Sequence, residues 1–281
     1  MVLHTQKETL VQALSSVNKN DKIGFVPTMG ALHNGHISLV KKALAENKVV
    51  VVSIFVNPTQ FNNTADLQKY PRTPEDAISL LKNLKGELVV YLPSVSDLYE
   101  NSVSAKKYNF GGLQNEMEGK HRKGHFDGVG TIVSKLLKII KPHNAYFGEK
   151  DFQQLQIVKK LVSIEKLPVK IWGCPILREK NGLAMSSRNK RLSIKQFEEA
   201  TLIYKTLNEV RAKFNATSIA DLNALVSERF LQNPELKLEY FEIANEATLK
   251  TAKRKNKASK YRAFIAAFAG EVRLIDNISL N

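Results

Sequence analysis

Short apolar runs alternate with segments of helical spacing in the first third of the chain. The runs IGFV (23–26), VVVVSIFV (49–56) and ELVVYL (87–92) have the length and composition of buried strands. Residues 37–47 and about 74–84 lie between these runs and are typical of helices. This β-α-β-α-β order predicts a parallel sheet with helices on both faces, because parallel strands need crossover connections. Ligands should bind beyond the carboxyl ends of its strands.

The alternation continues further along the chain and then changes. A strand, a helix and a strand are predicted at 144–148, 151–164 and 169–174, followed by two helices at 193–214 and 219–231. Three more strands are predicted at 238–244, 262–270 and 272–278, the last two joined in a hairpin at Gly270. We therefore predict an α/β fold: a Rossmann-like, doubly wound parallel sheet over residues 1–174 and a smaller α+β C-terminal domain over 175–281, with the boundary near Pro175.

The composition fits a folded protein of a reducing compartment. The 281 residues are 43% hydrophobic, which suffices for a packed core and argues against disorder. Cys174, the single cysteine, permits neither an internal disulfide nor a cysteine-based zinc site. The apolar runs are too short to span a bilayer, and the first residues lack the pattern of a secretory signal. We expect a cytoplasmic protein with no membrane partner.

One stretch concentrates residues that suit a phosphate site. PTMGALHNGHISLV (27–40) runs from a predicted strand into a predicted helix. Gly30 and Gly35 allow tight turns and close approach of the backbone to a ligand, and Asn34 is a candidate helix cap. The first amides of a helix have no partner within it and attract anions. The pattern therefore predicts a phosphate-binding helix start.

Two histidines, His33 and His36, accompany this helix start. Their rings could donate hydrogen bonds to phosphate oxygens and stabilise charge that builds up in a transition state. A pair of structural or surface histidines is the alternative, and metal binding is another. Two histidines alone make a poor zinc site, since catalytic zinc usually has three protein ligands.

A second junction between a strand and a helix, FGEKDFQQL (147–155), offers complementary groups. Gly148 permits close approach, and Lys150 can neutralise phosphate. Asp151 could cap the helix, hold a ribose hydroxyl or lie near Mg²⁺, although no metal ligand set is evident. A solvated lysine is the alternative for Lys150.

Two further segments carry polar groups that suit substrates. FVNPTQF (55–61) follows the second strand, and the amides of Asn57 and Gln60 can both donate and accept hydrogen bonds, which suits a substrate with hydroxyls and a carboxylate. MSSRN (185–189) combines two hydroxyls with the permanent charge of Arg188, which suits a triphosphate.

These motifs together resemble a known family. PTMGALHNGHISL resembles the His-x-Gly-His signature of the nucleotidyltransferase superfamily, which includes class I aminoacyl-tRNA synthetases. Over about residues 20–192 the chain resembles the pantothenate synthetase (pantoate–β-alanine ligase) family, through that signature and FVNPTQF (55–61), DLQKYPRT (66–73), GHFDGVGTIVSKLL (124–137), FGEKDFQQL (147–155) and REKNGLAMSSRN (178–189). The resemblance is weaker in the C-terminal third.

The resemblance implies a two-step reaction. ATP and (R)-pantoate would give pantoyl adenylate and pyrophosphate, and the amine of β-alanine would then displace AMP to give pantothenate. It also implies Mg²⁺ bound with ATP, a homodimer, and closure of the second domain over the nucleotide.

The resemblance also implies roles for individual residues. His36, matching the family's proton donor, is expected with His33, Lys150 and Arg188 to stabilise phosphate and leaving-group charge. Gln60 and Gln154 match pantoate ligands, and Asn57 and Gln60 would also lie near β-alanine. The implied ATP-binding residues are Met29, Gly30, Ala31, Leu32, His33, Asn34, Gly35, His36, Gly148, Glu149, Lys150, Asp151, Leu177, Met185, Ser186, Ser187 and Arg188.

The chain departs from the family pattern at two positions. Lys123 stands where a proline is usual, and Asn181 replaces a common aspartate, which affects loop stiffness more than bond making. Arg122 and His125, beside the first departure, are candidates for shaping the site or a subunit contact.

Two other functions must be considered, and the first is suggested by the positive net charge of the chain. Lys and Arg number 42 against 27 Asp and Glu, a formal charge of +15, and the basic run KTAKRKNKASKYR (250–262) is concentrated. An RNA-binding relative of a synthetase would use such charge, whereas a solvated surface is the alternative and a positive field also attracts nucleotides. RNA binding does not explain the amides of Asn57, Gln60 and Gln154, so we expect no nucleic-acid partner. Another nucleotidyltransferase, transferring AMP to a phosphorylated acceptor, is the second alternative.

Overall fold

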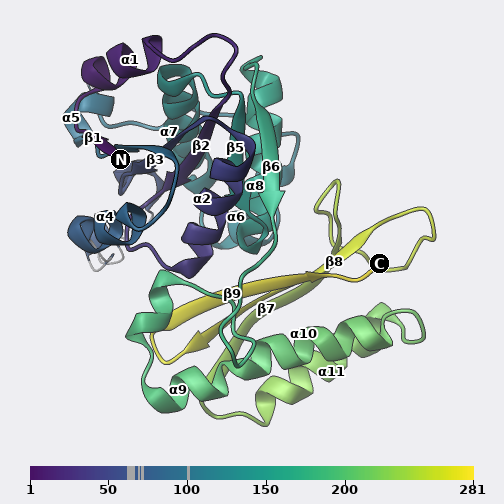
Figure 1. Cartoon of the computed structure of the whole chain (residues 1–281). Helices are drawn as coiled ribbons and strands as arrows, with labels where there is room; N and C mark the ends of the chain where they lie inside the picture. Colours follow the sequence, from purple (N-terminus) through teal and green to yellow (C-terminus); the bar gives the residue numbers. More distant parts are fainter. Residues whose placement is uncertain (62–66, 69, 71–72, 100–101) are drawn as a thin grey trace.

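The computed structural model describes residues 1–61, 67–68, 70, 73–99 and 102–281. Within this part of the chain, one parallel and one antiparallel sheet form two domains that lie against each other (Figure 1). The predicted fold class is confirmed. Four residues of the motif 66–73 lie outside the described residues, namely Asp66, Lys69, Pro71 and Arg72.

Six parallel strands form the first sheet, in the order β1-β4-β3-β2-β5-β6. They are β1 (Val2–His4), β2 (Ile23–Thr28), β3 (Val49–Ile54), β4 (Glu87–Tyr91), β5 (Asn144–Gly148) and β6 (Lys170–Cys174). The chain extends from β2 to β3 and β4 in one direction and later returns to β5 on the other side of β2. The strand order therefore reverses between β2 and β5, and doubly wound sheets bind ligands at the carboxyl ends of strands at such a point.

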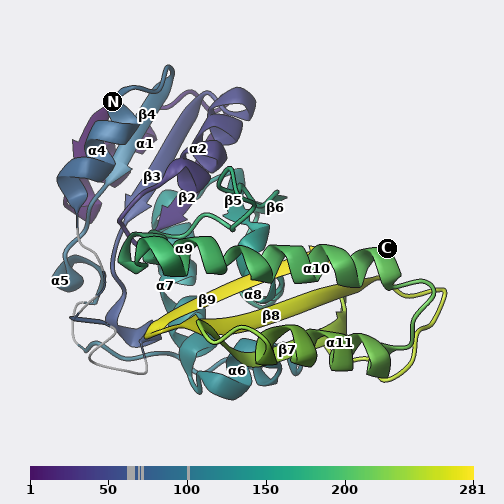
Figure 2. The same cartoon turned by 90° about the horizontal axis from the view of Figure 1, so that it is seen from below.

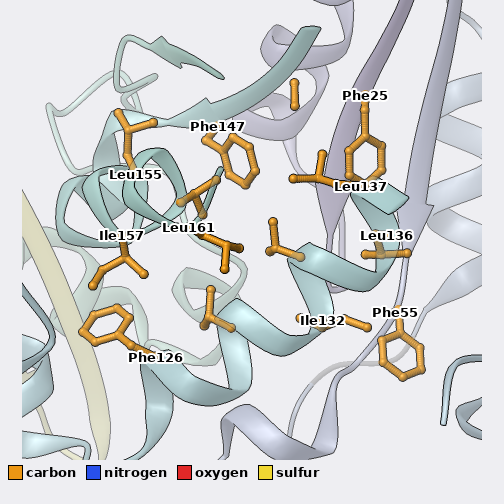
Figure 3. Packing of buried hydrophobic residues seen from close by; sticks show 14 of the residues in the cluster. Phe25, Phe55, Phe126, Ile132, Leu136, Leu137, Phe147, Leu155, Ile157 and Leu161 are labelled. Atoms are coloured by element: carbon orange, nitrogen blue, oxygen red, sulfur yellow. The ribbon is translucent and has the colours of Figure 1, made fainter. Parts of the chain in front are cut away.

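Helices cover both faces of this sheet, as predicted. One face carries α2 (Asn34–Glu46) and α4 (Pro74–Lys82), and the other carries α1 (Lys7–Ser15), α7 (His125–Ile140) and α8 (Phe152–Ile164). Successive strand residues enter different cores, because side chains alternate between the faces of a strand. Phe25 packs with α7 and α8, whereas Val26 packs with α2 and α4. Figure 3 shows the larger core, where Phe25, Phe147 and Leu137 lie together.

Shorter helical turns connect these elements. They are α5 (Val95–Leu98), α6 (Met117–His121), and the 3-10 turns η1 (Pro58–Gln60), η2 (Leu113–Asn115), η3 (Glu149–Asp151) and η4 (Ser187–Arg191).

The second sheet is antiparallel, in the order β7-β8-β9. Its strands are β7 (Leu236–Asn245), β8 (Tyr261–Ala269) and β9 (Val272–Ser279), and β8 and β9 form the hairpin expected at Gly270. One face packs against α10 (Thr201–Lys213) and α11 (Ile219–Leu231), which Figure 2 shows in front of the strands. The other face meets the first domain, where Phe264 packs against Phe152 with ring centroids 6.0 Å apart.

Two features of the fold differ from the sequence predictions. The single helix predicted at 193–214 is wrong, because α9 (Ile194–Glu199) and α10 are separated at Ala200, whose carbonyl accepts from the amide only three residues ahead, in Ile203, at 3.1 Å. α7 was not predicted, since it contains Gly128 and Gly130. Gly128 is required there, because a Cβ would lie 2.3 Å from the carbonyl oxygen of Thr59 in η1.

The link between the domains follows β6 directly. The predicted boundary near Pro175 lies one residue beyond that strand and stays a prediction. In the described part of the chain, every helix falls short of the length and apolarity that a membrane span needs.

Candidate active site

A cleft of about 270 Å³ lies at the switch point of the parallel sheet, between the segments that follow β2 and β5 and the strands of the second sheet. Most of the predicted site residues line it: Met29, His33, Gly35, His36, Asn57, Gln60, Gly148, Lys150, Asp151, Gln154, Leu177, Met185, Ser186, Ser187 and Arg188. Five others are not among its lining residues: Gly30, Ala31, Leu32, Asn34 and Glu149. The fold thus brings together groups from motifs that are far apart in the chain.

The start of α2 is capped by a histidine. His33 takes the N-cap position, and its Nδ1 accepts from the backbone amide of Gly35 at 3.1 Å. The prediction that Asn34 caps the helix is wrong, because Asn34 is the first helical residue and its side chain is exposed. Gly35 makes the histidine cap feasible, since a Cβ there would lie 2.7 Å from Cε1 of His33.

The rings of His33 and His36 lie side by side, with centroids 4.1 Å apart. Both are neutral at physiological pH, because their pKa values are lowered. Burial lowers the pKa of His33 to about 4, and the charge of Lys150 adds to this effect. Burial lowers the pKa of His36 to about 3, with further contributions from His33 and Lys150. Nδ1 of His36 accepts from the amide of His33 at 3.4 Å, as Nδ1 of His33 does from Gly35. The proton of each neutral ring therefore lies on Nε2, which can donate to a ligand.

The end of β5 supplies a cation and a carboxylate. Lys150 lies in the turn η3, and its Nζ is 3.8 Å from Oδ1 of Asp151. Asp151 takes the N-cap position of α8, but its side chain makes no capping hydrogen bond. The carboxylate is about half exposed, so it can interact with a ligand or with a cation that a ligand carries.

The amides of η1 divide into a buried support and a contact group. Asn57 is 1% exposed, and its Nδ2 donates to Oε1 of Gln60 at 3.2 Å and to the carbonyl of Gly128 at 3.1 Å. Its Oδ1 accepts from the Tyr99 hydroxyl at 2.7 Å. Asn57 is thus committed to protein partners, and it orients the amide of Gln60. Nε2 of Gln60 donates to the sulfur of Met29, which is a weak acceptor.

Two more residues of the first domain complete this side of the cleft. His125 is buried, and its ring lies with Nδ1 2.8 Å from the backbone oxygen of Gln60. Burial lowers the pKa of His125 to about 4, helped by the charge of Arg122, so the neutral ring donates to that carbonyl from Nδ1. Gln154, on α8, lines the cleft, and its amide has no hydrogen-bond partner among the described residues.

The segment MSSRN lies on the same cleft from the second domain. Ser186 caps η4, and its hydroxyl accepts from the amide of Arg188 at 3.2 Å. Ser187 is buried, and the guanidinium of Arg188 lies 5.9 Å from the ring centroid of Tyr70. The loop therefore brings hydroxyls and a permanent charge to the groups of α2 and η3.

Several cleft residues were missed by sequence reasoning. The main polar ones are Tyr70, Glu118, Gln153, Tyr240, Asp276 and Asn277. Asp276 and Asn277 carry a readable signal, because two adjacent polar residues interrupt the apolar strand VRLIDNI, and buried polar residues have specific partners. Glu118 and Tyr240 lie in segments without a comparable signal.

The described residues contain no cluster of three or more His, Cys, Asp or Glu side chains that could hold a metal ion. Two carboxylates of the cleft are already paired with arginines, Glu118 with Arg273 and Asp276 with Arg178. Asp151 remains as the carboxylate nearest to the lysine of the cleft. These residues therefore do not form a metal site made of protein ligands alone.

A doubly wound sheet with paired neutral histidines, a lysine and an arginine loop at its switch point defines a nucleotide-binding α/β enzyme. The chain matches the family model described as pantoate-beta-alanine ligase over residues 2–279, and it belongs to that family.

Relatives and solved structures agree with this assignment. The chain is 56% identical to the pantothenate synthetase of Flavobacterium psychrophilum, with 92% of each chain covered, and 50% identical to that of Christiangramia forsetii over the full length of both. The crystal structure of pantothenate synthetase from Thermus thermophilus is similar with a TM-score of 0.91 and 36% identity, covering 100% of this chain and 99% of that one. The pantoate-beta-alanine ligase of Francisella tularensis, complexed with beta-gamma ATP and β-alanine, has a TM-score of 0.83 and 40% identity, covering 100% and 98%.

Proposed function

We propose that this protein is an ATP-dependent ligase that joins (R)-pantoate to β-alanine through a pantoyl adenylate. The observation that carries the proposal is the composition of the cleft. The donating histidines of α2 and Lys150 line it together with the amides of Gln60 and Gln154. The first group suits nucleotide phosphates, and the second suits a small acid with hydroxyls. Membership of the pantoate-beta-alanine ligase family supports the same substrates.

The adenylation step needs positioning and charge balance from the protein. A carboxylate oxygen of pantoate attacks the α-phosphorus of ATP, the bond to the bridging oxygen breaks, and pyrophosphate leaves. His33 and His36 donate to phosphate oxygens from Nε2, while Lys150 and Arg188 balance the charge of the phosphates. Because burial keeps the two rings neutral, these donors are present over the whole physiological pH range.

The amides hold the acid in line with the nucleotide. Nε2 of Gln60 can exchange the Met29 sulfur for a pantoate oxygen at small cost, because sulfur is a weak acceptor. Gln154 offers a second amide. In the second step the amine of β-alanine attacks the activated carbonyl, a C–N bond forms, the C–O bond to AMP breaks, and the amine loses a proton.

Mg²⁺ would enter this site with ATP. Magnesium is commonly held by one or two carboxylates together with substrate phosphates, and Asp151 fits that description. The ion would supply charge neutralisation at the phosphates. The residues of the chain orient the acid and donate the hydrogen bonds.

We also propose that the protein works as a homodimer in the cytoplasm. The resemblance to the family supports the dimer. The lone, buried thiol of Cys174, which permits no internal disulfide, supports a reducing compartment.

One assay tests the proposed function. With ATP, Mg²⁺, pantoate and β-alanine, the protein should form AMP and pantothenate in equal amounts, as measured by chromatography. Without pantoate it should form neither, and Gln154→Ala should raise the KM for pantoate more than the KM for ATP. AMP formed equally well without pantoate would contradict the proposal, and a stable nucleotide conjugate would indicate the alternative nucleotidyltransferase. Tight, salt-sensitive RNA binding without turnover would indicate the other alternative.

A further inference from the structure

Two adjacent polar residues of β9 lie at the cleft although they belong to the second sheet. Asp276 and Asn277 are 4% and 2% exposed, and both line the cleft. On the same strand, Leu274 and Ile278 pack in the core with α10 and α11. Because side chains alternate along a strand, Asp276 shares their face, whereas Asn277 faces the parallel-sheet domain. Neighbouring polar side chains of β9 therefore point to opposite faces of the second sheet and bind different parts of the protein.

Asn277 makes hydrogen bonds that fix the orientation of its amide. Nη1 of Arg262 donates to Oδ1 of Asn277 at 2.6 Å. Because a guanidinium only donates, Oδ1 faces Arg262 and Nδ2 faces the opposite way. There Nδ2 donates to the backbone carbonyls of Glu149 and Lys150, both at 2.9 Å. One side chain of the second sheet therefore holds two successive carbonyls of η3.

Arg262 is itself held firmly in place. It is 7% exposed, its Nε donates to Oε1 of Glu246 at 2.9 Å, and its guanidinium lies 4.0 Å from the ring centroid of Phe152. Its Nη2 also lies 3.8 Å from Oε2 of Glu149, and an arginine anchored on these three sides cannot follow a rotation of Asn277. The amide of Asn277 consequently has one favourable orientation, the one that caps η3.

The position of Lys150 depends on this turn. Its side chain starts from the middle residue of η3, so a shift of the turn moves the ammonium by a similar distance. Asp151, which could have stabilised the turn as a helix cap, makes no capping hydrogen bond from its side chain. The bonds from Asn277 are thus the side-chain anchors that the described residues provide for these carbonyls.

Asp276 binds Arg178, which precedes the MSSRN segment (185–189). Nη1 and Nη2 of Arg178 donate to its two carboxylate oxygens at 2.6 and 3.1 Å, and the amide of Asn277 donates to Oδ1 at 2.8 Å. Arg178 precedes the MSSRN segment and also donates to the carbonyl of Gly182 at 3.1 Å. Adjacent residues of β9 therefore connect η3 with the segment that leads to Arg188.

We propose that Asn277 is a positioning residue for adenylation. It holds η3 so that Lys150 meets the nucleotide phosphates. Together with Asp276 it fixes the position of η3 relative to the MSSRN segment. The inference deepens the proposed function and rests on it.

The first test is Asn277→Asp, which keeps the size of the side chain. A carboxylate still accepts from Arg262 but cannot donate to the carbonyls of η3. Single-turnover adenylation, measured as pyrophosphate release from ATP and pantoate, should fall about 10- to 100-fold, as expected for a small misplacement of a charged group. The KM for pantoate should change less than about threefold. Ile278→Val, on the other face of the same strand and packed in the core with α10 and α11, is the matched control and should keep adenylation within about twofold of wild type.

The second test separates positioning from a general structural role. If Asn277 acts through Lys150, adding Asn277→Asp to a Lys150→Met variant should reduce adenylation and ATP affinity far less than it does in the wild type. If Lys150→Met turns over too slowly for adenylation to be measured, ATP affinity from calorimetry still allows the single and double variants to be compared. Equal losses in the two backgrounds, or an Asn277→Asp variant as active as the Ile278→Val control, would overturn the proposal while leaving the proposed function intact. A wild-type protein that forms no adenylate would overturn the function instead.

Discussion

His125, which supports the cleft by its hydrogen bond to the backbone of Gln60, also makes the stability of the protein depend on pH. Its pKa is lowered to about 4 by burial and by the charge of Arg122. A histidine in the unfolded chain titrates near a pKa of 6.5, so as pH falls the unfolded state binds this proton first. The stabilising effect of the neutral, buried ring is thus complete above about pH 6.5 and is lost progressively toward about pH 4.

Replacing this ring should flatten the pH dependence of stability. In His125→Asn the amide nitrogen can take the place of Nδ1 and donate to the carbonyl of Gln60, but no proton is taken up on unfolding. Between pH 7.5 and 5.5 the wild type should lose about 1 kcal/mol more unfolding free energy than the variant, as measured by urea denaturation. Above pH 7.5 the two curves should run parallel. Equal losses between pH 7.5 and 5.5 would show that His125 does not carry this dependence.

At the same scale, residues that line the cleft could be predicted where they lie close to the end of a strand in the sequence. His33 and His36 lie at the start of the helix that follows β2, Lys150 lies just after β5, and parallel strands bring their carboxyl ends to one edge. The sequence favours Asn34 as the helix cap because asparagine is a common cap, whereas glycine at position 35 lets the ring of His33 fold back and cap the helix instead. Asn277 could not be predicted, since its role depends on how the second sheet meets η3, more than a hundred residues earlier.

At the scale of elements, the basic run 250–262 has a structural member. Nζ of Lys255 donates to the carbonyls of Phe214 and Thr217, at 2.5 and 2.8 Å, and lies 5.1 Å from the ring centroid of Phe214. Phe214 is the C-cap residue of α10, where a helix leaves its last acceptors without partners, and Thr217 lies in the loop just before α11. Lys255 therefore anchors the end of α10 with a favourable charge.

Lys255→Met should lower the free energy of unfolding by up to about 1 kcal/mol, since the side chain is exposed and water partly replaces its hydrogen bonds. Lys257→Met, an exposed neighbour in the same run, makes the same change of charge and is the control. Thermal unfolding of the two variants measures the difference. If both lose the same amount, the effect is one of net charge and not of capping.

The sequence predicts some helices and strands better than others. β3 could be predicted because a strand buried on both faces is mostly apolar, and in β3 Ser53 alone is polar. α7 was not, since its two glycines lower helix propensity and are kept for close packing against η1 and neighbouring rings. The break between α9 and α10 lies at an alanine, which favours helices, so tertiary packing decides it and the local sequence does not.

At the scale of the whole molecule, a buried ionic group joins the two domains beside the cleft. Arg273 of β9 donates from Nη2 to Glu118 of α6 at 2.7 Å and to Glu239 of β7 at 2.5 Å, and the Tyr240 hydroxyl donates to Glu118 at 2.8 Å. Burial alone would raise the pKa of Glu118, but the hydrogen bond and charge of Arg273 outweigh it and lower the pKa to about 2. The carboxylate thus stays ionised chiefly through a partner from the other domain, and Arg122 of its own domain, 3.8 Å away, adds to the effect.

Removing that partner should destabilise the entire protein. Arg273→Met removes the two short hydrogen bonds to the buried carboxylate of Glu118 and leaves it the longer ion pair with Arg122 at 3.8 Å, so the free energy of unfolding should fall by about 3 kcal/mol in urea denaturation. The double variant Glu118→Gln/Arg273→Met should recover part of this loss, because it removes the buried charge that has lost its main partner. Lys120→Met, which breaks the more exposed pair with Glu242, is the control and should cost less than about 1 kcal/mol. A loss in Arg273→Met no larger than in this control would mean that the two domains hold together without the ionic group.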